Sequence, residues 1–112
     1  MARIIEGIKE TKTLKYTHDA EVSAGDVIVV GGVVLIAVND AEADEENVYM
    51  FAGRAALPKA TGAGEAIDSV AKVYWDGTQA TTTATDNDPV GICVEAADDD
   101  DDEVIVDMFA TI

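Results

Sequence analysis

The feature that most constrains the fold is an apolar run, DVIVVGGVVLIAVND, which spans residues 26–40 and holds a glycine pair near its middle. β-Branched residues 27–30 precede Gly31 and Gly32, and aliphatic residues 33–38 follow them. β-Branched side chains pack well on a pleated sheet, and two glycines can adopt the positive φ angles of a two-residue hairpin turn. A buried helix is the alternative, because a continuous apolar run carries no periodicity. The glycine pair and the many valines favour a buried hairpin against which the rest of the chain packs.

The composition supports a small aliphatic β domain. The 112 residues suit one domain, and 48% of them are hydrophobic although only 5% are aromatic. We therefore predict an all-β (mainly β) fold, a compact β-barrel or sandwich of about eight short strands with little helix. Residues 1–16 are expected to form an N-terminal arm or edge strand, and residues 17–112 a single β domain.

The formal net charge of −16 excludes some classes of partner. Such a surface repels nucleic acid and keeps the protein soluble. The first residues, MARIIEGIKE, lack the apolar core of a signal peptide, and no apolar run is long enough to span a membrane. We expect a protein that is made in a cytoplasm and binds neither nucleic acid nor membranes.

The other strands are predicted where apolar or β-branched runs end at turn residues. Gly53 marks a bulge or bend, Pro58 ends a strand because it cannot donate to a ladder, and Asp76-Gly77 is a hairpin signal. The predicted strands are residues 11–17, 47–57, 70–75, 78–85, 89–96 and 104–110.

Residues 59–69 are predicted to be a flexible loop with one helical turn at 65–68. The Gly62-Ala63-Gly64 sequence resembles part of a phosphate loop. It lacks the Gly-Lys-Ser/Thr ending and the strand-to-helix context of such loops, so phosphate binding is not expected.

The N-terminal segment differs from the rest of the chain in charge. Four of the seven basic residues lie within residues 1–20, whereas the remainder is strongly acidic. Exposed lysines on an edge strand commonly protect against edge pairing, which is one interpretation. The other is an arm that binds a partner or a neighbouring subunit. The candidate partner-binding residues are Arg3, Ile4, Ile5, Ile8, Lys9 and Lys12.

The two halves of the chain resemble each other at an offset of 56 residues. Residues 34–53 align without gaps over residues 90–109, and six of the 20 positions are identical. Both segments read as an apolar strand, an acidic connection and a second apolar strand. Chance similarity between valine-rich strands is one explanation, because binary patterning repeats in β proteins. The other is a pair of related strand-loop-strand units with acidic loops in equivalent places.

The acidic run Asp98–Glu103 raises the question of a metal site. Carboxylate oxygens bind Ca²⁺, and the weak candidates for ligands are Asp98, Asp100 and Asp102. The spacing does not match an EF-hand loop, which alternates ligands with other residues and needs a central glycine. A solvated surface loop is the favoured interpretation, and no cofactor is expected.

Several short motifs occur in a specific order. They are Gly25-Asp26 with Gly31-Gly32, Leu57-Pro58-Lys59, Val73-Tyr74-Trp75-Asp76, and Thr81–Thr85 leading into Val90-Gly91. In this order the chain, from about Thr11 to Ala110, resembles the small capsid cement or decoration proteins of tailed phages. The five-aspartate loop departs from that pattern, in which a shorter turn containing glycine is expected.

That resemblance implies a β-rich protein on the outer face of an icosahedral head. Members of this kind bind the major capsid protein, usually as homotrimers at local threefold positions, and stiffen the shell. The resemblance carries over no catalytic residue. The alternative function is a small acidic β-barrel binding module for Ca²⁺ or a cationic protein partner. An enzyme that uses His18 and Cys93 is the least favoured hypothesis, because no nucleophile motif accompanies them and free cysteine is usually a buried hydrophobe.

Overall fold

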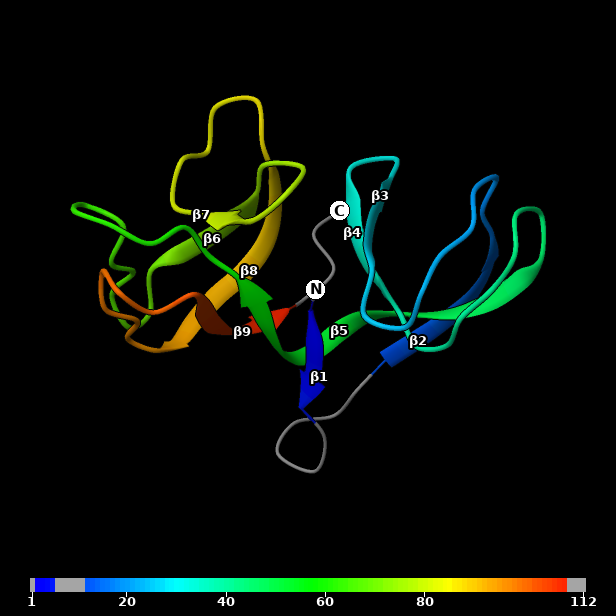
Figure 1. Cartoon of the computed structure of the whole chain (residues 1–112), viewed down its shortest axis with the longest axis horizontal. Helices are drawn as coiled ribbons and strands as arrows, with labels where there is room; N and C mark the ends of the chain where they lie inside the picture. Colours follow the sequence, from blue (N-terminus) through cyan, green and yellow to red (C-terminus); the bar gives the residue numbers. More distant parts are fainter. Residues whose placement is uncertain (1, 6–11, 109–112) are drawn as a thin grey trace.

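The computed structural model describes residues 2–5 and 12–108, which form one antiparallel sheet curled into a half-barrel (Figure 1). The strands are β1 (Arg3–Ile5), β2 (Lys12–Thr17), β3 (Val27–Val30), β4 (Val33–Ala37), β5 (Glu46–Pro58), β6 (Lys72–Trp75), β7 (Ala80–Thr81), β8 (Asp88–Glu95) and β9 (Glu103–Met108). None of the described residues is helical, so that part of the chain has no helix that could cross a membrane. The predicted all-β fold is confirmed.

The long strand β5 connects the two parts of the molecule. Its first half pairs with β2 on one edge and β4 on the other, and its second half pairs with β9 and β1. The halves meet at Gly53, which has a φ of 136°, next to a register shift opposite Lys12 and Thr13. We call β2, β3, β4 and the first half of β5 lobe one, at the right of Figure 1. Lobe two is the second half of β5 with β6–β9, at the left.

The central hairpin forms as the glycine pair predicts. β3 and β4 pair antiparallel from Val27 opposite Ile36 to Val30 opposite Val33. Gly31 and Gly32 connect them with φ angles of 58° and 82°. A two-residue turn with both φ angles positive matches the twist of the flanking strands, which is why it is favoured in hairpins.

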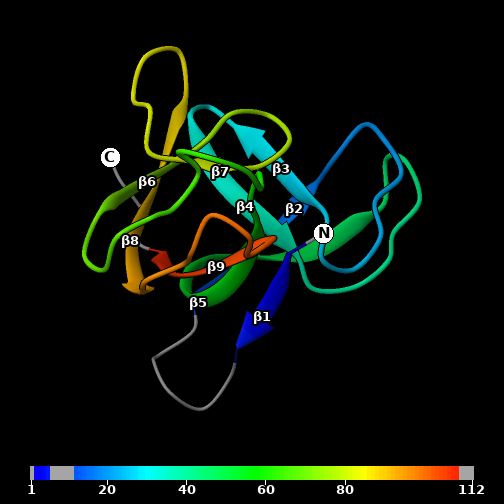
Figure 2. The same ribbon diagram turned by 60° about the vertical axis from the view of Figure 1, so that its left-hand side comes forward.

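In lobe one, β4 and the first half of β5 carry buried residues on both faces of the sheet, whereas β2 and β3 are exposed or half-buried. One face carries Leu35 and Tyr49, which belong to a core cluster within lobe one. The opposite face carries Val34, Ile36 and Met50, which belong to the larger cluster that fills lobe two. β4 lies beside lobe two in Figure 1 and Figure 2, where it contacts β8. Val34, Ile36 and Met50 of lobe one therefore complete the hydrophobic core of lobe two.

Two of the sequence predictions are wrong in detail. Only residues 80–81 of the predicted strand 78–85 pair with β6, because polar side chains in this segment bond locally instead. The Asp76 carboxylate accepts hydrogen bonds from the backbone of Thr78 and Gln79, both at 2.9 Å. No helical turn forms at 65–68, where Ile67 makes a two-way backbone bridge with Ala97 at 2.9 Å.

The hairpin turn gives a direct test of this backbone conformation. Gly32→Val should reduce the free energy of unfolding by about 1–2 kcal/mol or more, because a β-branched residue is strained at positive φ. A Cβ atom would meet nothing within 4 Å at this position, so the effect would come from the backbone alone. Gly31→Asn is the matched control and should be nearly neutral, since asparagine suits this turn position. Urea unfolding measures both, and an unchanged midpoint for Gly32→Val would contradict the turn.

Candidate functional site

The turns that lead into β3 and β6 have the same hydrogen bonds. In lobe one, Gly25 N–H donates to the Ala37 carbonyl at 2.8 Å, and in lobe two Val70 N–H donates to the Cys93 carbonyl at 2.8 Å. In return, Ala37 N–H donates to the Asp26 carbonyl and Cys93 N–H donates to the Ala71 carbonyl, both at 2.9 Å. Ala37 and Cys93 differ by the 56 residues of the sequence repeat. The turns are structural equivalents.

The two acidic connections are also equivalent. Val22 bridges Ala41 in lobe one as Ile67 bridges Ala97 in lobe two. In the first loop Glu42 N–H donates to the Glu45 carboxylate at 3.1 Å, and in the second Asp98 N–H donates to the Asp101 carboxylate at 2.9 Å. These residues also lie 56 apart, so the internal similarity is a structural duplication and the prediction of equivalent acidic loops is confirmed.

The acidic loop of lobe two is held by its own carboxylates and by one lysine. The Asp99 carboxylate accepts the backbone N–H groups of Glu65 and Ala66 at 3.0 and 2.9 Å. Lys59 is 5% exposed, and its ammonium donates to the carbonyls of Ala60 and Asp101 at 2.7 and 2.9 Å. Bonds to charged groups are among the stronger hydrogen bonds in proteins. The loop is therefore a fixed structure despite its composition.

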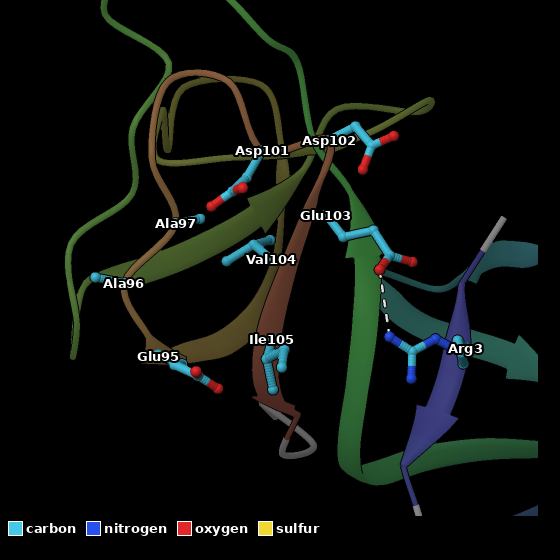
Figure 3. Close-up of a pocket in the computed structure, with 9 residues that line it drawn as sticks. All are labelled: Arg3, Glu95, Ala96, Ala97, Asp101, Asp102, Glu103, Val104 and Ile105. Carbon is cyan, nitrogen blue, oxygen red and sulfur yellow. Dashed lines mark hydrogen bonds and ion pairs between the residues drawn. The ribbon is translucent and has the colours of Figure 1, made fainter.

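The metal candidates Asp98, Asp100 and Asp102 are exposed on this loop. In Figure 3 the Asp101 carboxylate points toward Ala97, whereas the carboxylate of Asp102 points away from it. Across residues 2–5 and 12–108, no three His, Cys, Asp or Glu side chains are grouped as a metal site. A cavity of about 230 Å³ lies beside the loop, and the cation within it is Arg3, bound to Glu103 at 3.2 Å. In the described contacts of this loop, carboxylates accept backbone N–H groups, and these bonds hold the loop in place.

The N-terminal candidates lie on two strands that both pair with β5. Arg3 and Lys12 are exposed, whereas Ile4 packs partly buried against the larger core cluster. Ile5 pairs through its backbone with Arg54. Ile8 and Lys9 lie outside the described residues.

Positive charge on the described surface is concentrated on these strands. Arg54 is bound to Asp107 at 2.8 Å, and Lys59 is buried. The described basic residues that are exposed are Arg3, Lys12, Lys15 and Lys72, three of them on β1 and β2, and of these Arg3 is bound to Glu103 at 3.2 Å. We call Arg3, Lys12 and Lys15 the basic strip. On a molecule with a net charge of −16, positive charges gathered on two strands attract an acidic partner to that side.

The His18 and Cys93 side chains sit in different environments. His18 Nδ1 lies 3.7 Å from an Asp19 carboxylate oxygen after β2, where its ring packs near Tyr16. Cys93 is buried in β8, and burial raises the pKa of its thiol, with a further contribution from nearby carboxylates. A thiol kept protonated is a poor nucleophile.

Sequence analysis did not identify Val70 as unusual, but comparison of the two equivalent turns does. Val70 occupies the position of Gly25 with a φ of 70°, and it is 70% exposed. A β-branched residue is strained at positive φ. Only comparison of the two turns reveals this, since VAKVYW reads as an uninterrupted strand.

Comparisons with known proteins give one match. Residues 8–108 match a protein-family model described as phage cement protein. Neither the curated proteins nor the solved structures contain a significant match to the chain.

The acidic loop provides a matched pair of variants. Asp99→Ala should lower the free energy of unfolding by about 1 kcal/mol, because the Ala66 N–H loses its acceptor and the Glu65 N–H keeps only the longer bond to the Gly62 carbonyl at 3.2 Å. Asp100→Ala removes the same charge from an exposed neighbour and should change stability by less than about 0.5 kcal/mol. Chemical unfolding compares them, and equal effects would contradict the capping role of Asp99.

Relief of the strain at Val70 provides a second test. Val70→Asn should raise the free energy of unfolding by up to about 1 kcal/mol, because asparagine tolerates the left-handed conformation. Val29→Asn, at an exposed position with extended backbone in β3, is the control and should be destabilising. Thermal melting distinguishes them, and a lower melting temperature for Val70→Asn would argue against the strain.

Proposed function

This chain belongs to the phage cement protein family, and we propose that it decorates and stabilises the outer surface of an icosahedral tailed-phage head as a homotrimer at local threefold positions. The observation that carries the proposal is the family match over residues 8–108, which includes every strand of the domain except β1. The motif order found in the sequence supports the same role. A cement protein acts by adding contacts between capsid subunits, so its function requires a rigid body and an adhesive surface.

The domain has features that suit the rigid body. β4 and the first half of β5 carry core residues on both faces of the sheet, and the acidic loop of lobe two is held by hydrogen bonds of Asp99 and Lys59. The acidic surface would keep decorated particles apart in solution. In this proposal residues 17–112 form the β domain, and residues 1–16 form the segment that attaches it.

The basic strip suits the adhesive surface. Lys12 and Lys15 are exposed on β2, and Arg3 is exposed on β1. Within the described residues only β5 pairs with β2, so a strand of the major capsid protein could add to the other edge of β2. The proposed partner-binding residues remain Arg3, Ile4, Ile5, Ile8, Lys9 and Lys12. Trimers that occupy several sites at once would bind more tightly through multivalency.

The proposed role is structural and uses no enzyme chemistry, cofactor, nucleic acid or membrane. The protein would be made in the host cytoplasm and join the head from outside. Cys93 contributes to packing, and the acidic loops contribute solubility.

Binding to expanded, undecorated heads tests this function. The wild-type protein should cosediment with such heads and raise the temperature at which they release DNA. Lys12→Glu with Lys15→Glu should weaken attachment about tenfold or more, because two favourable charges become repulsive, and the loss should be greater at low salt.

Lys72→Glu is the control, because it makes one Lys→Glu reversal on β6, away from the proposed strip, and should bind nearly as well as the wild type; Lys12→Glu alone gives the matched single reversal on β2. Failure of the wild-type protein to bind heads would overturn the cement role. An equal loss in the double variant and in Lys72→Glu would place the attachment surface elsewhere.

A further inference from the structure

The strand β2 forms one edge of the lobe one sheet, and the direction of its backbone groups follows from the bonds of β5. The Val48 carbonyl accepts the Val38 N–H at 3.0 Å, and the Val48 N–H donates to the Asn47 side chain at 2.8 Å. Lys15 lies opposite Val48 in the ladder. Opposed residues of an antiparallel pair exchange both backbone bonds or neither, so the N–H and carbonyl of Lys15 point away from β5.

Three backbone positions of β2 share this outward direction. Because the direction alternates along a strand, Thr13, Lys15 and Thr17 present their N–H and carbonyl groups to the outer edge, whereas those of Leu14 and Tyr16 bond to β5. In the part of the chain that the structure describes, no strand other than β5 pairs with β2. An edge of this kind is a template on which an extended segment can add as a further strand.

The side chains that flank Lys15 lie on the apolar face of β2. Leu14 is opposite Tyr49, and the rings of Tyr16 and Tyr49 meet edge to face with centroids 6.1 Å apart. The centre of this face is covered, since Leu35 and Tyr49 are at most 2% exposed. At its border Leu14 is 37% exposed, and Tyr16 is only partly buried. Apolar surface is therefore left open along β2 and not at the centre of the lobe.

The opposite face of β2 is polar and carries a positive charge at its middle. Thr13, Lys15 and Thr17 are all exposed on this face. Opposite charges that face each other across two strands are stabilising, and like charges are destabilising. Two copies of β2 that paired antiparallel about Lys15 would place lysine against lysine, so the edge resists pairing with itself. The same ammonium favours a strand that places a carboxylate opposite it.

We propose that the outer edge of β2 binds an extended segment of the major capsid protein in which an acidic residue lies opposite Lys15 and apolar residues lie opposite Leu14 and Tyr16. Backbone hydrogen bonds supply the affinity, and the apolar–acidic–apolar pattern supplies the specificity. The choice of the capsid protein as the partner rests on the function proposed above. The position of the edge and the pattern it selects rest on β2 alone.

Two substitutions at Lys15 separate the backbone bond from the charge. Lys15→Gln and Lys15→Pro both remove the ammonium, but only proline also removes the outward N–H. Proline is tolerated on an edge strand where its nitrogen faces solvent, so both variants should melt close to the wild type. Lys15→Gln should weaken binding to expanded, undecorated heads about threefold, and Lys15→Pro should weaken it at least about tenfold further. Cosedimentation measures the binding.

Leu14→Pro is the control for the direction of the backbone groups. The Leu14 N–H bonds to β5, so proline at this position should lower the melting temperature sharply, unlike proline at the neighbouring position 15. Equal loss of melting temperature in Leu14→Pro and Lys15→Pro would contradict the alternation and overturn the proposal.

Amide hydrogen exchange of the wild-type protein tests the edge without any substitution. In the free protein the amides of Leu14 and Tyr16 should exchange at least about tenfold more slowly than those of Thr13 and Lys15. The probes are the heads and a synthetic peptide of about seven residues, a usual strand length, in which glutamate alternates with valine. Either probe should slow exchange at Thr13 and Lys15. A peptide that alternates lysine with valine is the matched control and should leave both amides unchanged.

The outcomes distinguish this edge from the cement role. The proposal is overturned if neither the heads nor the glutamate peptide slows exchange at Thr13 and Lys15, if the two peptides act equally, or if Lys15→Pro and Lys15→Gln bind heads equally well. A wild-type protein that binds the glutamate peptide but not the heads would overturn the cement role and its capsid partner. That result would support the outer edge of β2 as a binding site for an acidic strand.

Discussion

The structure depends on the backbone pairing of a single strand. β5 supplies the last strand of lobe one and the first strand of lobe two, so the same thirteen residues satisfy ladders in both. Gly53 allows the change of direction between the halves, because its φ of 136° lies in a region that other residues rarely adopt. Both lobes are therefore fixed relative to each other by covalent geometry and by the shared core, as a shell-reinforcing protein requires.

Several of the acidic side chains accept hydrogen bonds from backbone groups in or beside their own loops. Carboxylates that look surplus in the sequence accept backbone hydrogen bonds: Asp99 closes the loop of lobe two, and Asp101 and Glu45 cap equivalent turns in the two lobes. Lys59 supplies a buried cation to the carbonyls of the same loop. Some of the negative charge thus shapes the loops, while most of the other described carboxylates stay exposed to water.

The features that could be predicted from the sequence are those set by neighbouring residues in the chain. The Gly31-Gly32 turn, the end of β5 at Pro58 and the burial of Cys93 follow from turn chemistry and apolar patterning, and the repeat at 56 residues pointed to the equivalent loops. Prediction from the sequence failed where polar side chains accept local backbone hydrogen bonds, as those of Asp76 and Thr81 do, and there the expected strand shrinks to two residues. It could not reveal the strain at Val70, because the backbone conformation of this residue depends on a turn that pairs with a distant strand.

Because both lobes share β5, we expect lobe one to pair its strands before lobe two does. The strands of lobe one are complete once the first half of β5 has been synthesised, although β2 must pair with β5 from Thr17 opposite Glu46 to Lys12 opposite Ala52. Lobe two cannot pair Gly53 with Met108 until the last strand has been synthesised, and closing such a long loop is slow. During that interval Val34, Ile36 and Met50 have no apolar cover from lobe two. The half-made protein therefore passes through a stage in which its own first lobe is the surface most prone to aggregation.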